Sequence, residues 1–229
     1  YLDNEAAPKS AIDDILKSKL KGFFNPDLPV DKLFEEVNIK SNYWANDYKV
    51  YGLGLTGRLE GTIFSDWREG TFDDSLPYCH GLDFGFNPDP CGLIKVALDK
   101  KNKKIYVEEM AYLQNLGTDD IEKLLKDRTG PNEMIIADSA GKITIHDLRQ
   151  RGLNVQACIK GPGSIVSGLK KLMDYEIIVC GNSPNLKTEF NNYIWNDKKA
   201  GIPIDKFNHL IDPLRYAFER LERGAGGML

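Results

Sequence analysis

The chain has 229 residues, of which 41% are hydrophobic and 28% are charged, and its formal net charge is −4. This size and balance predict one main α/β domain with an appendage. No apolar run approaches the ~18 residues needed to span a bilayer, so we expect a soluble protein without a membrane partner. An acidic chain has no overall attraction for nucleic acid, and any DNA contact must come from a local basic patch.

Residues 1–50 differ in pattern from the rest, with helix-like stretches at 11–21 and 31–37 separated by prolines. The chain opens on YLDN, without an initiator methionine or a helix cap, which suggests a piece of a longer polypeptide. We therefore expect residues 1–50 to be a linker or trailing segment of a preceding domain, and residues 51–229 to form the main domain.

A three-stranded meander is predicted next, because β-rich runs at 78–84, 91–98 and 104–113 follow one another closely. Thr118 is expected to cap a helix with two aspartates in its first turn. Strands and helices then alternate: a strand at 133–137, a helix ending at Arg151, a strand at 154–159, a helix at 163–174 and a strand at 176–180.

The Ser183-Pro184 pair predicts a helix cap and first position, and a last amphipathic helix runs to about Arg223. A meander followed by parallel α/β units predicts a mixed sheet flanked by helices, in the order of a ribonuclease H-like α/β fold.

The four cysteines are Cys79, Cys91, Cys158 and Cys180, and each lies in an apolar, strand-like stretch without paired spacing. No secretion signal opens the chain. We expect reduced core thiols in a cytosolic compartment.

Three segments look like motifs of nucleotide-binding proteins, but the sequence around each argues against that function. GLGLTG at 52–57 is followed by a predicted turn and strand, whereas a dinucleotide loop must open a helix. DFG at 83–85 precedes the only run that resembles a kinase catalytic loop, which is the wrong order. Residues 163–170 lack the Ser or Thr of a Walker loop, so we expect no ATPase in this chain.

Three aspartates, Asp83, Asp138 and Asp212, stand where a strand or helix pattern breaks. A carboxylate beside an apolar run loses hydration, which costs several kcal/mol unless it is paired or bound to a cation. With no obvious basic partner in the sequence, oxygen-only ligands favour Mg²⁺ or Mn²⁺. A cluster of this kind is typical of two-metal phosphodiester hydrolysis.

Each aspartate also has a structural interpretation. Asp83 could be a turn residue, although its strand pattern continues to Phe86, and its flanking glycines would let a phosphate or metal approach the backbone. Asp138 could be a helix cap or an Asx turn. Asp212 could cap a helix whose first residue is Pro213.

The functional alternative for Asp212 starts the last helix earlier, with Asn208 as cap. His209 and Asp212 then share a helix face, and the imidazole lies beside the metal site for proton transfer or phosphate contact. Pro213 then forfeits one helical hydrogen bond.

Several segments together resemble a known family, the nuclease domain of the large terminase subunit of tailed bacteriophages. These segments are YGLG (51–54), LEGTIF (59–64), GLDFGF (81–86) with Asp89-Pro90, ADSA (137–140), KGPGSI (160–165) and NHLIDPLRYA (208–217). The chain departs from the family pattern at Gly141-Lys142, where an acidic residue is usual, and at Pro213, where alanine is usual.

The resemblance implies a ribonuclease H-like, metal-dependent endonuclease that cuts concatemeric double-stranded viral DNA in the cytoplasm of the infected bacterial host. It also implies an ATPase motor domain N-terminal to this one, with the portal protein and the small terminase subunit as partners. By position, Asp83, Asp138 and Asp212 correspond to the metal-binding carboxylates and His209 to the accompanying catalytic histidine.

On this interpretation Asp83 bridges two Mg²⁺ or Mn²⁺ ions roughly 4 Å apart, and Asp138 and Asp212 complete the two ligand sets. Lys160, Lys170 and Lys171 are the candidate DNA contacts. Two alternatives stay open: a ribonuclease H-like resolvase or transposase-type nuclease, and a docking module of the packaging motor with weak nuclease activity.

Overall fold

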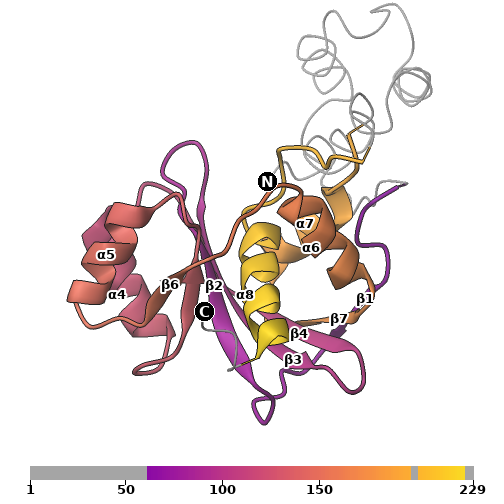
Figure 1. The fold of residues 1–229 in the computed structure, drawn as a ribbon, viewed down its shortest axis with the longest axis horizontal. Helices are drawn as coiled ribbons and strands as arrows, with labels where there is room; N and C mark the ends of the chain where they lie inside the picture. The colour runs from indigo at the N-terminus through magenta and orange to yellow at the C-terminus, as the bar shows by residue number, and fades with distance from the viewer. Residues whose placement is uncertain (1–60, 197–200, 225–229) are drawn as a thin grey trace, which may run out of the picture. The chain divides into compact units, whose positions relative to one another are not determined.

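The computed structural model describes residues 61–196 and 201–224, which contain a seven-stranded mixed sheet in the order β1-β7-β4-β3-β2-β5-β6 (Figure 1). The predicted meander is confirmed as β2 (Tyr78–Asp83), β3 (Cys91–Asp99) and β4 (Lys104–Leu113), paired antiparallel. The predicted segments 1–50 and 52–57 lie outside the described residues.

Four parallel strands extend the meander on both sides. β5 (Ile135–Ala137) pairs with β2, and β6 (Val155–Ala157) pairs with β5. On the other side β7 (Glu176–Cys180) pairs with β4, and β1 (Trp67–Gly70) pairs with β7.

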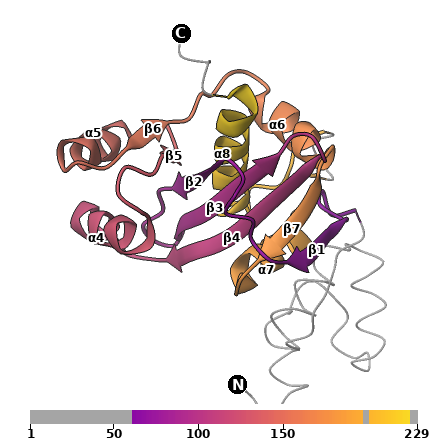
Figure 2. The same cartoon turned by 90° about the horizontal axis from the view of Figure 1, so that it is seen from below.

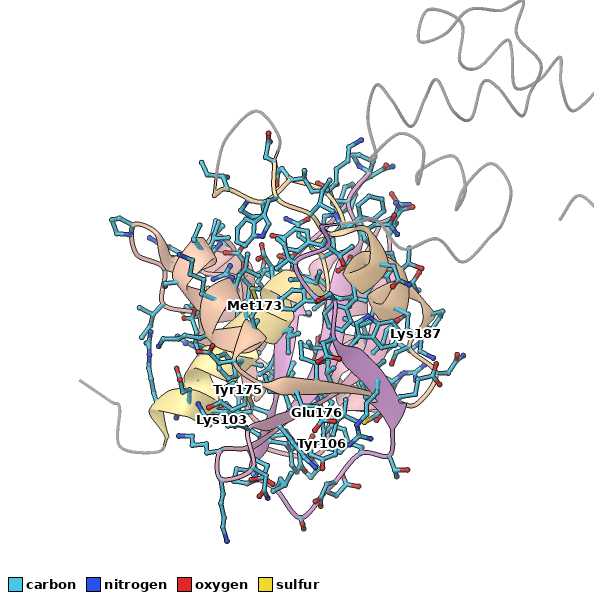
Figure 3. All side chains as sticks on the ribbon, turned by 90° about the vertical axis from the view of Figure 1, so that its right-hand side faces the viewer. Lys103, Tyr106, Met173, Tyr175, Glu176 and Lys187 are labelled. Carbon is cyan, nitrogen blue, oxygen red and sulfur yellow. The ribbon has the colours of Figure 1, made fainter. Side chains whose placement is uncertain are left out.

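The edge strand β1 is absent from the sequence prediction because only Trp67 of its four residues is shielded from solvent. Backbone pairing with β7 holds it in place, and ion pairs at the surface accompany that pairing. Arg68 pairs with Glu176 at the start of β7, and Lys187 Nζ lies 2.8 Å from Glu69 Oε1 (Figure 3).

Helices cover both faces of the sheet (Figures 1 and 2). α4 (Thr118–Arg128) and α5 (Lys142–Gln150) pack on the face formed by Leu82, Leu93 and Ile135. α6 (Ser164–Met173), α7 (Pro184–Asn192) and α8 (Ile211–Arg223) contribute to the other core, which includes alternate residues of β3 and β4. None of the described helices is both long and apolar enough to cross a membrane.

The predicted helix ends are mostly confirmed. Ser183 is the N-cap residue of α7 and Pro184 is its first residue, although the Ser183 hydroxyl donates to the Cys180 carbonyl at 2.7 Å and makes no capping bond to the helix. Gly152, with a φ of 86°, follows the end of α5. The prediction that Thr118 caps α4 is wrong, because the cap is Gly117, whose N–H donates to Asp120 Oδ2 at 3.0 Å. The four cysteines are free and buried, as predicted.

Candidate active site

Two of the three predicted aspartates lie side by side at the edge of the sheet. Asp83 ends β2, and Asp138 directly follows β5; their predecessors Leu82 and Ala137 are register partners in the parallel pair. The Asp138 N–H also donates to the Leu82 carbonyl at 3.1 Å. Because alternate residues of a strand share a face, both carboxylates emerge on the face that α8 covers.

Two glycines let the start of α8 approach this edge. A Cβ at Gly81 would lie 2.1 Å from the Pro213 carbonyl oxygen, and a Cβ at Gly92 would lie 2.1 Å from the His209 carbonyl oxygen. The interpretation of Gly81 as an opening for a phosphate or metal is therefore wrong, since helix backbone fills that space. This approach brings Asp212, in the first turn of α8, to the edge that carries Asp83.

The predicted start of the last helix also needs correction. α8 begins at Ile211 with Leu210 as its cap, so neither Asn208 nor Asp212 is the N-cap residue. Pro213 is the third helical residue. The Asp212 N–H donates to the Asn208 carbonyl at 2.7 Å and the Leu214 N–H to the Leu210 carbonyl at 3.0 Å, so the proline leaves out the bond between these two, as predicted.

The cap of α8 is a side chain that the sequence analysis missed. The Glu189 carboxylate on α7 accepts hydrogen bonds from the N–H groups of His209, Leu210 and Ile211 at 3.0, 2.8 and 3.1 Å. Burial raises the pKa of Glu189 to about 7, although these bonds oppose the rise. A capping glutamate twenty residues before its helix has no local sequence signal.

The preceding helix, α7, is capped by a carboxylate in the same way. The Glu109 carboxylate on β4 accepts from the N–H groups of Asn185 and Leu186 at 2.9 and 3.0 Å, which caps α7. Two carboxylate caps, from the partly buried Glu109 and the buried Glu189, thus link the central sheet to α7 and α7 to the turn that carries His209 and Asp212.

His209 contacts two carboxylates, those of Asp83 and Asp89. Its Nδ1 lies 3.4 Å from Asp83 Oδ2 and its Nε2 lies 3.6 Å from Asp89 Oδ1. The hydrogen bond to Asp83 raises the pKa of His209 above its ordinary value, against the effect of burial. The imidazole therefore lies beside the carboxylates, as predicted.

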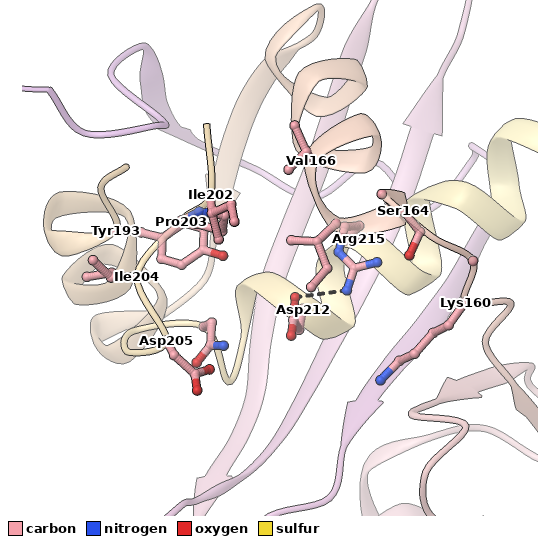
Figure 4. A pocket seen from close by; sticks show the side chains of 14 residues that line it. Lys160, Ser164, Val166, Tyr193, Ile202, Pro203, Ile204, Asp205, Asp212 and Arg215 are labelled. Atoms are coloured by element: carbon pink, nitrogen blue, oxygen red, sulfur yellow. Dashed lines mark hydrogen bonds and ion pairs between the residues drawn. The ribbon is translucent and has the colours of Figure 1, made fainter. Parts of the chain in front are cut away.

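Basic partners accompany the other two aspartates, and the expectation of three unpaired carboxylates is wrong. Lys160 Nζ lies 2.5 Å from Asp138 Oδ1. Arg215 Nη2 donates to Asp212 Oδ1 at 3.0 Å (Figure 4), and the Arg215 side chain is only 1% exposed. The i, i+3 spacing of Asp212 and Arg215 was visible in the sequence.

Glycine also makes room for this arginine. A Cβ at Gly168 of α6 would lie 2.6 Å from Arg215 Cδ, so only glycine fits between α6 and α8 at this point. Burial raises the pKa of Asp212, and the charge of Arg215 opposes that rise.

Tyr216 on α8 lies near the three carboxylates, whose charges affect its pKa. Burial raises the pKa of the Tyr216 hydroxyl, and the charges of Asp212, Asp138 and Asp83 raise it further, in that order. Lys160 Nζ also lies 5.4 Å from the centre of the Tyr216 ring. Tyr216 of α8 therefore lies near Lys160 and within electrostatic reach of the three aspartates.

The oxygen-only donors suit a hard divalent cation such as Mg²⁺ or Mn²⁺. Among residues 61–196 and 201–224, however, no group of three or more carboxylate, imidazole or thiol side chains is close enough to share one metal ion. Instead, the ammonium of Lys160 and the guanidinium of Arg215 provide the positive charge at Asp138 and Asp212. For Asp138 to offer both oxygens to a metal, Lys160 must leave it.

Lys170 and Lys171 do not join this group. Both are exposed in the last turn of α6, near Met173 (Figure 3), whereas Lys160 precedes the first turn. Lys171 Nζ lies 2.9 Å from Glu222 Oε2 near the end of α8. Their contact with DNA stays a prediction.

Comparison with known proteins finds similarity to large terminase subunits of bacteriophages. The family model described as "Terminase RNAseH like domain" matches residues 83–220. The large terminase subunit of Bacillus phage SPP1 is 32% identical over 171 residues, which are 71% of this chain and 40% of that protein. The PBSX phage terminase large subunit of Bacillus subtilis (strain 168) is 30% identical over 148 residues, 62% of this chain and 34% of that protein. The chain thus spans less than half the length of these curated relatives.

Solved structures agree. The large terminase nuclease domain of bacteriophage SPP1, crystallised with bound Mn, matches with a TM-score of 0.60 and 31% identity, over 69% of this chain and 97% of that one. The P22 large terminase nuclease domain has the same fold, with a TM-score of 0.57 at 17% identity over 72% of this chain and 93% of that one. The predicted ribonuclease H-like fold is confirmed, and the chain belongs to the family of terminase ribonuclease H-like domains.

Proposed function

We propose that this domain is a metal-dependent DNA endonuclease that cuts concatemeric viral DNA during genome packaging. The observation that carries the proposal is the position of Asp83 and Asp138 side by side at one edge of the sheet, next to the first turn of α8, which carries Asp212. Membership of the terminase family supports it, as does the Mn bound by the SPP1 nuclease domain.

Asp83, Asp138 and Asp212 would hold two Mg²⁺ or Mn²⁺ ions, which would supply Lewis-acid activation of water and neutralise charge on the scissile phosphate. Asp83 is the central ligand in this assignment, because it lies next to Asp138 and also contacts His209.

His209 orients Asp83 through Nδ1 and, with its raised pKa, can hold a proton at the edge of the site. Arg215 holds Asp212 in one position and balances its charge. Lys160 has two successive roles in the proposal: it neutralises Asp138 in the free protein and turns to a DNA phosphate when metal takes its place.

The pairing of Asp138 and Asp212 with internal cations supports a second candidate function. A site whose carboxylates are already neutralised suits a docking module of the packaging motor in which nuclease activity is weak until a partner or DNA displaces Lys160. In the whole protein we propose an ATPase domain N-terminal to this one, with the portal and the small terminase subunit as partners, acting in the cytoplasm of the infected host.

Supercoiled plasmid separates these candidates. The nuclease proposal predicts nicking and then degradation with Mn²⁺ or Mg²⁺, and complete loss of both in EDTA. Asp83→Asn should abolish cutting while Asp127→Asn, on the exposed face of α4, should not. Cutting that persists in excess chelator would refute the metal assignment, and folded wild-type protein that binds Mn²⁺ without cutting would favour the docking module.

A further inference from the structure

A pocket of about 580 Å³ opens beside Asp212, between the start of α6 and residues 202–205 (Figure 4). This volume falls in the range of roughly 300–1,000 Å³ that is typical of sites for small organic ligands. The catalytic assignments above use only three of its lining residues, Lys160, Asp212 and Arg215. The rest of the pocket is unexplained by them.

Most of the wall is apolar. Ile165 is 44% exposed and Ile202 is 50% exposed, so both present apolar surface to solvent at the pocket. An exposed apolar wall next to charged groups is typical of a ligand site rather than of core packing. The apolar lining residues are Ile165, Val166, Ile202, Pro203 and Ile204.

A buried hydroxyl points into this space. Tyr193, the residue that follows α7, is 1% exposed, and in Figure 4 its hydroxyl points from the wall toward Asp212. A tyrosine hydroxyl can both donate and accept a hydrogen bond, so it offers a polar group to a ligand in the pocket. Arg215 also lines the pocket, and its buried Nε and Nη1 have no hydrogen-bond partner among the residues that the structure describes. Asn208 adds an amide to the same wall.

Positive charge lies at the opposite end. Lys160 and Ser164 line the pocket beside the N-terminus of α6, and the positive end of the helix dipole favours an anion there. From one end to the other, the pocket thus offers hydrogen-bonding groups, apolar walls and a phosphate-binding end. A nucleotide has matching parts, namely a polar base edge, apolar base faces and an anionic phosphate.

We propose that this pocket binds one unpaired nucleobase of the DNA strand, next to the phosphate held at the aspartates. The inference rests on the proposed nuclease function and deepens it. The isoleucine side chains contact the faces of the base, and Tyr193 and Asn208 bond its edge. Removing a base from the duplex costs a few kcal/mol, so DNA that is already unpaired at the cut is the better substrate.

The probe is 2-aminopurine deoxyribonucleoside monophosphate, titrated with the full chain and followed by fluorescence anisotropy. We expect a saturable rise that thymidine monophosphate competes away and deoxyribose 5-phosphate does not. Ile165→Trp fills the pocket and should weaken binding at least tenfold, and Tyr193→Phe should weaken it less. Met173→Trp is the matched control, because Met173 is equally exposed at the other end of α6.

A cleavage assay gives the second readout. Wild-type protein should cut a duplex with an unpaired bubble faster than the same duplex fully paired, and Ile165→Trp should lose this preference. Absence of saturable nucleotide binding, or equal competition by deoxyribose phosphate, would overturn the pocket assignment even if DNA is cut. Nucleotide binding without cutting of any DNA would instead sink the nuclease function and leave the pocket standing.

Discussion

The ammonium of Lys160 lies 2.5 Å from Asp138 Oδ1, so the residue predicted to contact DNA also neutralises a predicted metal ligand. The Lys160 ammonium must leave Asp138 before a metal ion can bind both carboxylate oxygens, so the ammonium competes with the metal for this carboxylate.

Lys160→Ala should therefore have two opposite effects. Removal of the competing ammonium should lower the Mn²⁺ concentration for half-maximal cleavage, whereas loss of a phosphate contact should weaken DNA binding equally across sequences. The salt dependence of binding should flatten by about one phosphate contact. Metal titration of cleavage and filter binding at several salt concentrations measure the two effects. Lys123→Ala on exposed α4 is the control, and an unaltered salt slope for Lys160→Ala would show that DNA lies elsewhere.

Glu189→Ala should destabilise the protein by roughly 2–4 kcal/mol, because it leaves three backbone N–H groups without their acceptor. Cleavage should fall further than the folded fraction does, since the turn that carries His209 and Asp212 loses its anchor. Urea denaturation and cleavage at a temperature where the variant is folded separate the two losses. Thr188→Ala is the control on α7, because Thr188 bonds only within its own helix.

Gly81→Ala should also displace α8, since the added Cβ would lie 2.1 Å from the Pro213 carbonyl oxygen. We expect a loss of about 3 kcal/mol in stability, typical of overpacking against backbone, and a severe loss of cleavage. The comparison is Gly117→Ala, where the nearest atom to the new Cβ is 3.5 Å away. Equal thermal stability of the two variants would contradict this account of how α8 docks.

The Glu133 carboxylate predicts a specific acid sensitivity. Burial favours its protonation, but hydrogen bonds from Tyr78, the Gly130 N–H and His80 outweigh that effect and lower its pKa to about 2. A carboxyl with a lowered folded-state pKa stabilises the protein above its unfolded-state pKa, and this contribution declines as the pH falls through the folded value.

Glu133→Gln should therefore cost up to about 3 kcal/mol near neutral pH, and the difference from wild type should shrink as the pH falls below about 4.5. Urea denaturation of both proteins between pH 7 and pH 3 measures this difference in the free energy of unfolding. A difference that stays constant over this range would show that the carboxylate charge is not what stabilises the cluster.

The sequence predicted the elements whose buried residues form a clear apolar pattern along the chain. The strands β2, β3 and β4 bury alternate or successive apolar residues, and α8 buries one broad face, so their positions were correct to within a residue or two at most ends. The edge strand β1 was missed because pairing with β7 and ion pairs hold it, and neither depends on apolar periodicity.

The candidate active site was predicted less completely, because several of its contacts join residues that are far apart in the sequence. Asp83, Asp138 and Asp212 were selected because each stands where an apolar pattern breaks, whereas the pairing of β2 with β5, which brings Asp83 beside Asp138, was not predicted. Glu189 could not be found, since its partners are backbone N–H groups twenty residues away. Lys160 was interpreted only as a DNA contact, because its pairing with Asp138 depends on the path of the chain after β6.

The docking of α8 on Gly81 and Gly92 also determines when the site can exist. Asp83 ends β2 and Asp138 follows β5, and both precede α8 in the chain, so Asp212 can reach them only after α8 has left the ribosome and packed on the sheet. A nascent or truncated chain without α8 has two of the three carboxylates. If the domain is the nuclease proposed above, such a chain should not cut DNA.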